Sequence, residues 1–201
     1  MSGASACLGH PARSKMFDSR ADIFFLNPKI PLADFPATYG VLYLLRRDIH
    51  RCLEDAKPPI SLPGTMAILA GVDLLAKFYV GDDARGKVGE RFRVFLKTYF
   101  HLESPRDEET IYQLRNSVLH SFGLYSRVSE TKTYYFAIEE TRHFFVHLLP
   151  DSDTYHIGVF ALKERFEQAV EWYRTALESN AELQRNFLTM YQNYGFIHMI
   201  T

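Results

Sequence analysis

The stretch Thr65–Tyr79, with the sequence TMAILAGVDLLAKFY, decides the fold class of this chain. It follows Pro63-Gly64, and its apolar residues fall on every side of a helix instead of along one stripe. A helix of this kind is buried all round, so the sequence predicts a helix in the middle of a bundle. Asp73 is the only charged residue before Lys77, and a buried carboxylate needs a partner of opposite charge.

Five more helices are predicted around this central one. They cover about residues 36–56, 85–100, 107–122, 161–179 and 181–193. Asp34 is the expected N-cap of the first, and Pro36 lies in its first turn. The helix over 107–122 begins with acidic residues that suit the helix dipole, and Gly123 is its expected C-terminal stop.

The pattern changes between this helix and the C-terminal pair. Residues 133–138, 143–148 and 155–160 are rich in β-formers and are separated by polar turns. We therefore predict a mainly α fold, an up-and-down helical bundle with a small antiparallel β meander inserted at about residues 131–160. Residues 1–20 are expected to be a flexible tail, and 21–201 a single domain. The apolar run Ile23–Leu26 is either a strand or a docking segment.

Composition bounds the function only broadly. The 201 residues are 47% hydrophobic and 14% aromatic, with a net charge of −1, which is typical of a globular protein and not of a broad nucleic-acid binder. The two cysteines, Cys7 and Cys52, do not suggest a disulfide scaffold, so a reducing cytoplasm is expected. No apolar run of transmembrane length and no export signal is recognised, and no membrane association is expected.

The helix over 107–122 divides its residues between two faces. One narrow arc, predicted to face the core, holds Ile111, Leu114, Val118 and Phe122. Asn116 and His120 are four residues apart on the opposite face, flanked by Leu119 and Tyr112, as at a partner interface. Arg115 lies near the edge of the core arc, where a partly buried arginine needs a carboxylate or another acceptor. We predict that Asp73 and Arg115 approach each other.

The hexapeptide Arg115-Asn116-Ser117-Val118-Leu119-His120 resembles the Arg-Asn-x-x-x-His motif of the HEPN family. Residues 89–100 and 111–121 also look like a bacterial HEPN branch, and the resemblance extends over about residues 35–125. It implies a helical bundle that dimerises with the motif at the interface. Many members of the family cleave RNA without a metal ion, whereas others are binding or scaffold domains.

The adjacent asparagine gives this match its specificity. An arginine followed five residues later by a histidine is expected about 0.6 times by chance in such a chain, and about 0.015 times once the asparagine is required. The pair Arg142 and His147 has the same spacing without the asparagine. It lies in a predicted strand, where residues five apart face opposite sides, so we interpret it as a decoy.

The resemblance implies that Arg115, Asn116 and His120 are catalytic, with Asp73 and Tyr112 in support. Histidine titrates near neutrality, so paired His120 residues of a dimer could supply the base and the acid of RNA cleavage. Arg115 could stabilise charge on the phosphate, and Asn116 could orient His120 or hold the phosphate. The expected partners are a second copy, an RNA substrate and an antitoxin-like protein, in a toxin or defence role.

No cofactor or metal is expected. The chain has no His-Glu-x-x-His or Cys-x-x-Cys, and His143 and His147 would lie roughly 13 Å apart on a strand. Two other functions stay open. One is a catalytically silent HEPN domain that binds a partner or a nucleotide, and the other is a plain helical interaction protein with a fortuitous motif.

Overall fold

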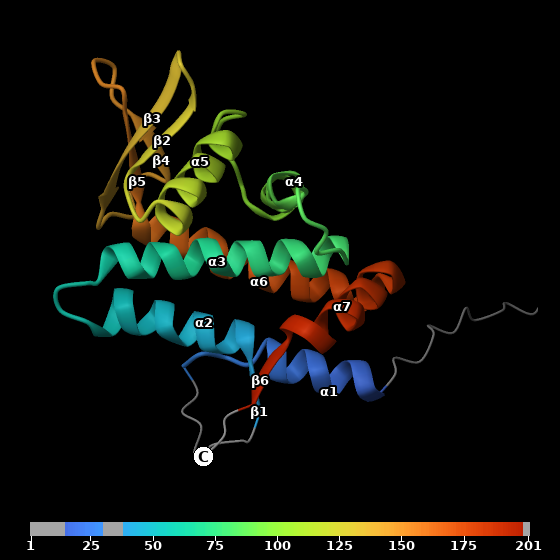
Figure 1. Cartoon of the computed structure of the whole chain (residues 1–201). Helices are drawn as coiled ribbons and strands as arrows, with labels where there is room; N and C mark the ends of the chain where they lie inside the picture. Colours follow the sequence, from blue (N-terminus) through green and yellow to red (C-terminus); the bar gives the residue numbers. More distant parts are fainter. Residues whose placement is uncertain (1–14, 30–37, 199–201) are drawn as a thin grey trace, which may run out of the picture.

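A computed structural model describes residues 15–29 and 38–198 of the chain (Figure 1). It is mostly helical, with 59% helix. Its α-helices are α1 (Lys15–Phe24), α2 (Val41–His50), α3 (Ser61–Val80), α4 (Val88–Tyr99), α5 (Asp107–His120), α6 (Val159–Ser179) and α7 (Ala181–Tyr194), and a π-helical turn, Arg51–Asp55, continues α2.

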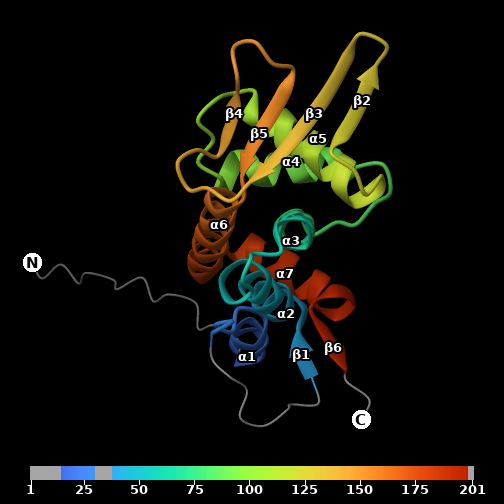
Figure 2. The same cartoon turned by 90° about the vertical axis from the view of Figure 1, so that its left-hand side faces the viewer.

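Helix α3 occupies the centre of the molecule, as predicted. Figure 2 looks along its axis and shows α2, α6, α7 and the α4–α5 pair around it. Ile68, Leu69, Val72, Leu75 and Phe78 are fully buried on its several sides. By length and composition α3 is the one described helix that could cross a membrane. Its burial among the other helices is the arrangement of a core helix in a bundle.

The sheet between α5 and α6 has the order β2-β3-β5-β4. Its strands are β2 (Tyr125–Ser129), β3 (Lys132–Glu139), β4 (Val146–Leu148) and β5 (Thr154–Gly158). The predicted antiparallel meander is wrong in one respect, because β5 runs parallel to β3 and the sheet is mixed. This placement buries Ile157 completely and stacks Tyr155 on Tyr134, with ring centroids 5.4 Å apart. Short β4 takes the outer edge.

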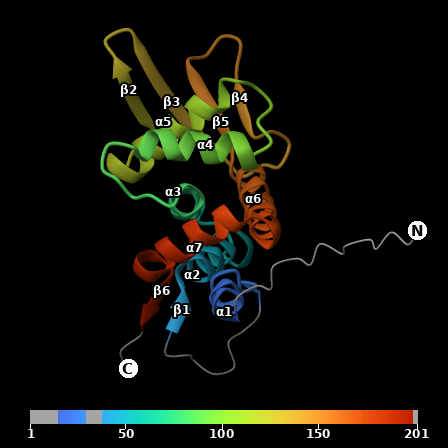
Figure 3. The same ribbon diagram turned by 90° about the vertical axis from the view of Figure 1, so that its right-hand side faces the viewer.

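A second, two-stranded sheet joins distant parts of the chain. Strand β1 (Thr38–Gly40) pairs antiparallel with β6 (Phe196–His198), as Figure 3 shows. Gly40 lies so close to α1 that a Cβ on it would be 2.4 Å from the carbonyl oxygen of Ile23. This contact holds residues 38–40 extended, so the first predicted helix begins at Val41 instead of residue 36. Asp34 and Pro36 lie outside the described residues.

Three local predictions also change. Residues 15–20, expected in the tail, belong to α1, and Ile23–Phe24 ends that helix instead of forming a strand. Phe24 is nevertheless fully buried, as a docking segment requires. Helix α5 ends at His120, so Phe122 lies beyond it and is 75% exposed instead of facing the core.

Candidate active site

Helix α5 places the motif between the central helix and the sheet. Its first turn carries Asp107, Glu108 and Glu109, where carboxylates interact favourably with the helix dipole. Ile111, Leu114 and Val118 are fully buried in the core. The same helix therefore leaves Arg115 buried at the edge of the core, Asn116 half-buried and His120 exposed.

Arg115 and Asp73 form the ion pair predicted from the sequence. The Nε of Arg115 donates to Oδ2 of Asp73 at 2.9 Å, and Nη2 donates to the same oxygen. Their side chains are only 9% and 16% exposed. The other carboxylate oxygen, Oδ1, is buried without a hydrogen-bond partner. Helix α3 therefore fixes the position of the guanidinium through one oxygen.

The remaining end of the guanidinium binds the other two motif residues. Nη1 of Arg115 donates to Oδ1 of Asn116 at 3.1 Å and contacts Nε2 of His120. A guanidinium has only donors, so Nε2 must accept, which requires a neutral imidazole with its proton on Nδ1. The three motif residues thus form one hydrogen-bonded group, anchored by Asp73.

Asn116 and His120 of this group line a cleft between helix α5 and strand β2, whereas Arg115 is buried and does not line it. The cleft has a volume of about 420 Å³ and is lined by Gln113, Asn116, His120, Ser121, Tyr125, Ser126, Arg127 and Val128. Ser126 donates to Oε1 of Gln113 at 2.7 Å, which holds the strand on the helix. Arg127 is the only charged lining residue and no carboxylate lines the cleft, so the cleft favours an anion.

The turn after α5 shapes the rim of the cleft. The Ser117 hydroxyl donates to the carbonyl oxygen of Gly123 at 2.7 Å, and the Gly123 N–H donates back to the Ser117 carbonyl at 3.2 Å. Between them Phe122 has a φ of 50°, the only positive value at a described non-glycine residue. The left-handed residue of this turn is therefore Phe122, although Gly123 was the predicted stop.

Not every predicted residue joins this group. Tyr112 contacts helix α4 instead, with the Arg93 guanidinium 3.8 Å from its ring centroid, and it does not line the cleft. The decoy also stays apart: Arg142 donates to Glu164 at 2.5 Å, and the His147 ring packs near Phe144. Among the described residues no group of three or more His, Cys, Asp or Glu side chains could hold a metal ion.

The strand side of the cleft was missed by the sequence reasoning. Strand β2 was not predicted, so neither Tyr125 nor Arg127 was a candidate. Most β2 side chains are exposed, and such a strand lacks the apolar alternation by which a strand is recognised. One signal was available in the sequence. The aromatic run of β3 was itself predicted as a strand, and a strand needs a neighbour to pair with, which the residues just before it could have supplied as the first arm of a hairpin.

Comparisons with known proteins identify no relative. No protein-family model matches the chain, and neither a curated protein nor a solved structure matches it.

Proposed function

We propose that this chain is a HEPN-type, metal-independent endoribonuclease that acts as a homodimer. The observation that carries the proposal is the hydrogen-bonded group of Arg115, Asn116 and His120, which Asp73 anchors at a cleft without carboxylates. Cleavage of a phosphodiester uses a cationic hydrogen-bond donor and an acid–base side chain, and this group offers a guanidinium and an imidazole. Arg115 and His120 lie within hydrogen-bonding distance of each other on helix α5.

The contact between Arg115 and Nε2 of His120 suggests an order of events. In the free protein Arg115 occupies Nε2 of His120, the lone pair that a general base would use. An RNA phosphate would compete with His120 for the Nη1 donor of Arg115, whose Nε and Nη2 stay on Asp73, because charge-assisted bonds to phosphate are stronger than a bond to a neutral imidazole. Substrate binding would then release Nε2 beside the ribose hydroxyl.

The chemistry then follows from two histidines. Nε2 of one His120 takes the proton of the 2′-hydroxyl, and O2′ attacks phosphorus. The P–O5′ bond breaks, and O5′ takes a proton from the imidazolium of the His120 in a second copy. Arg115 stabilises the charge on the phosphorane oxygens. The products are a 2′,3′-cyclic phosphate and a 5′-hydroxyl, and no metal ion takes part.

An apolar rim beside His120 supports the homodimer. Phe122, Leu124, Tyr125, Val128 and Tyr135 are 75%, 36%, 42%, 48% and 46% exposed. They follow α5 and belong to the edge of the sheet, where Tyr125 and Tyr135 are cross-strand partners. Clustered exposed aromatic residues are typical of the core of a protein interface. A second copy seated on this rim would bring its own His120 towards the cleft.

The test is cleavage of a defined RNA oligonucleotide in the presence of EDTA. His120→Ala should lower the rate by about 10²-fold or more, the range typical of a lost acid–base group. His147→Ala is the matched control, because His147 is also exposed and also follows an arginine by five residues. A 2′-deoxy substitution at the cleavage position should block the reaction. Equal activity of His120→Ala and the unsubstituted protein would refute the proposal.

The occupied Nε2 favours a second candidate function. If Arg115 stays on His120 when a ligand is present, the histidine has no free lone pair and the site is silent. The chain would then be a HEPN interaction module that binds an antitoxin-like protein or a nucleotide through the apolar rim and the cleft. The two functions separate in the same assay. Tight RNA or protein binding without any cleavage, insensitive to His120→Ala, identifies the silent module.

A further inference from the structure

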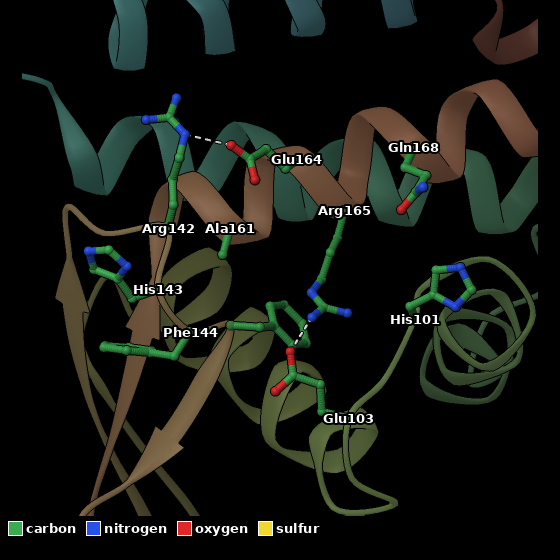
Figure 4. Close-up of a pocket in the computed structure, with 10 residues that line it drawn as sticks. His101, Glu103, Arg142, His143, Phe144, Ala161, Glu164, Arg165 and Gln168 are labelled. Atoms are coloured by element: carbon green, nitrogen blue, oxygen red, sulfur yellow. Dashed lines mark hydrogen bonds and ion pairs between the residues drawn. The ribbon is translucent and has the colours of Figure 1, made fainter.

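A second cavity lies beside the segment that leads into β4, at the opposite edge of the sheet from the motif cleft at β2. It has a volume of about 500 Å³ and is lined by residues from the segments 101–103, 142–145 and 161–168, which we call the α6 pocket (Figure 4). It shares no lining residue with the cleft at His120. Neither the sequence reasoning nor the proposed ribonuclease uses it.

Specific backbone contacts hold the segment that connects β3 to β4 in place. The Gly158 N–H donates to the carbonyl of Phe145 at 3.1 Å, and the Ala161 N–H donates to that of Thr141 at 3.3 Å. A Cβ on Gly158 would be 2.1 Å from the carbonyl oxygen of Phe144, so only glycine allows this approach. The loop is therefore docked on the start of α6.

The segment that connects α4 to α5 is fixed as well. Oδ2 of Asp107 accepts hydrogen bonds from the N–H groups of Glu103 at 3.0 Å and Ser104 at 2.9 Å. His101 packs edge-on against Trp172 of α6, with ring centroids 4.3 Å apart. Two loops that are far apart in the sequence are thus held against one helix, and the α6 pocket is a built cavity.

Two arginines are set in this pocket with donors to spare. Arg165 lies over the buried ring of Phe145, 4.5 Å from its centroid, and its Nη2 binds Glu103. Arg142 lies 4.8 Å from the ring centroid of Phe160, and its Nε binds Glu164. Figure 4 shows Arg165 reaching from α6 towards Glu103, with the His101 and His143 rings on opposite sides. Each guanidinium has five N–H donors, so most of them remain available.

The two carboxylates are weak competitors for these donors. The side chains of Glu103 and Glu164 are 59% and 55% exposed, and exposed ion pairs contribute only about 0–1 kcal/mol. A phosphate offers an arginine several oxygens and more negative charge than a carboxylate. It can therefore displace the exposed carboxylate, or bind the same arginine beside it. The imidazoles of His101 and His143 also line the pocket and can add N–H donors.

We propose that the α6 pocket binds a small phosphate ester of about mononucleotide size. Its volume falls in the range of roughly 300–1,000 Å³ that is typical of small-molecule sites. The phosphate lies against Arg165 between the two histidines, and the organic part lies against Phe144 at the pocket wall. This inference does not rest on the proposed ribonuclease activity, because the pocket and the cleft have separate residues.

Calorimetric titration of the full chain with AMP, adenosine and inorganic phosphate tests the proposal. AMP should bind, phosphate should compete with it, and adenosine should not bind. Arg165→Ala should weaken AMP binding at least about tenfold, as the loss of a charge-assisted contact implies. Arg174→Ala, on the same helix but away from the pocket, should leave it unchanged. Glu103→Gln should tighten binding, because it releases Arg165 from its carboxylate partner.

The Glu103→Gln variant keeps the test decisive if Arg165→Ala folds poorly. Weaker AMP binding by Glu103→Gln, or no binding of AMP and phosphate by the unsubstituted protein, overturns the proposal. A 2′-deoxy-protected RNA serves as the other phosphate source. If Arg165→Ala weakens the binding of this RNA but not that of AMP, the pocket belongs to an RNA path and the small-ligand proposal is overturned.

Discussion

Asp73 accepts two hydrogen bonds from Arg115 through the single oxygen Oδ2, and its other oxygen is buried without a partner. The pair joins the central helix α3 to the motif helix α5. A rigid anchor of this kind would fix Arg115 for the proposed catalysis, and it also makes the same arginine a structural residue. Its two roles can be separated by experiment.

Asp73→Ala should lower the free energy of unfolding by about 3–5 kcal/mol, because it leaves a buried guanidinium without its counter-charge. Asp73→Asn should cost less, since the amide oxygen can still accept from Arg115. Urea denaturation measures both, and a double-mutant cycle with Arg115→Met isolates the pair energy. His120→Ala is the control and should have little effect, because His120 is exposed. A loss below about 0.5 kcal/mol for Asp73→Ala would show that the pair is not structural.

Substitution of Phe122 should have opposite effects on the stability of the monomer and on the proposed dimer. Its left-handed φ of 50° costs a non-glycine residue about 1–2 kcal/mol, and its side chain is 75% exposed. Phe122→Gly should raise the unfolding free energy of the monomer by up to about 1 kcal/mol, because the entropy lost by glycine offsets part of the relief. The same change should weaken the dimer.

Phe122→Ala distinguishes the two effects, since it removes the ring but keeps the strain. If the proposed dimer forms through this rim, both variants should shift it to monomer in sedimentation experiments, and only the glycine variant should be stabilised. A dimer that is unchanged by both substitutions would mean that the apolar rim is not its interface.

The ionisation of Asp83 should make stability depend on pH. The Tyr194 hydroxyl, together with Lys77 and Arg91, holds the pKa of the Asp83 carboxyl below its ordinary value of 3.8. A lowered pKa in the folded state gives stability that is present above 3.8 and is lost as the pH falls through the folded-state pKa. Asp83→Asn should therefore destabilise the protein most at neutral pH. Thermal unfolding from neutrality to about pH 3 should show the two proteins converging, and a constant difference would contradict this linkage.

Gly158 should not tolerate a side chain. Gly158→Ala places a Cβ 2.1 Å from the Phe144 carbonyl oxygen, so the loop beneath the α6 pocket must move. We expect a loss of about 2 kcal/mol or more in unfolding free energy, and weaker AMP binding. Gly123→Ala is the matched control, because its Cβ would meet nothing nearer than the Ser121 carbonyl at 3.7 Å. Equal stability of both variants would contradict the close packing.

Helices with strong patterns and clear end signals could be predicted from the sequence. The central helix and both C-terminal helices agree with the structure to within a few residues, because their periodicity is long and their ends are marked by glycine, proline or asparagine. The Asp73–Arg115 pair could also be predicted, because the helical patterns place both charged side chains at the core. A buried charged side chain needs a partner of opposite charge, and each of these two residues supplies the other's.

Features that depend on distant residues could not be predicted. Strand β1 pairs with β6, which is about 160 residues away in the sequence, and β5 lies parallel to β3 between β3 and β4. Neither relation is present in a local pattern. Phe122 was assigned to the core because a wheel assumes that the helix continues, whereas the Ser117–Gly123 hydrogen bonds end it. Strand β2, which lines one side of the motif cleft, was also missed, because it is recognised by its pairing with β3 and not by its own sequence pattern.

The central position of α3 has a consequence for the order in which the chain is made. Synthesis runs from the N-terminus, so this apolar helix leaves the ribosome well before α6 and α7, which pack against it in the finished fold. The nascent chain must therefore carry the sides of this apolar helix that face α6 and α7 uncovered until those two helices have been made. A polypeptide stalled before α6 would present that helix to the chaperones at the ribosome exit and to other nascent chains.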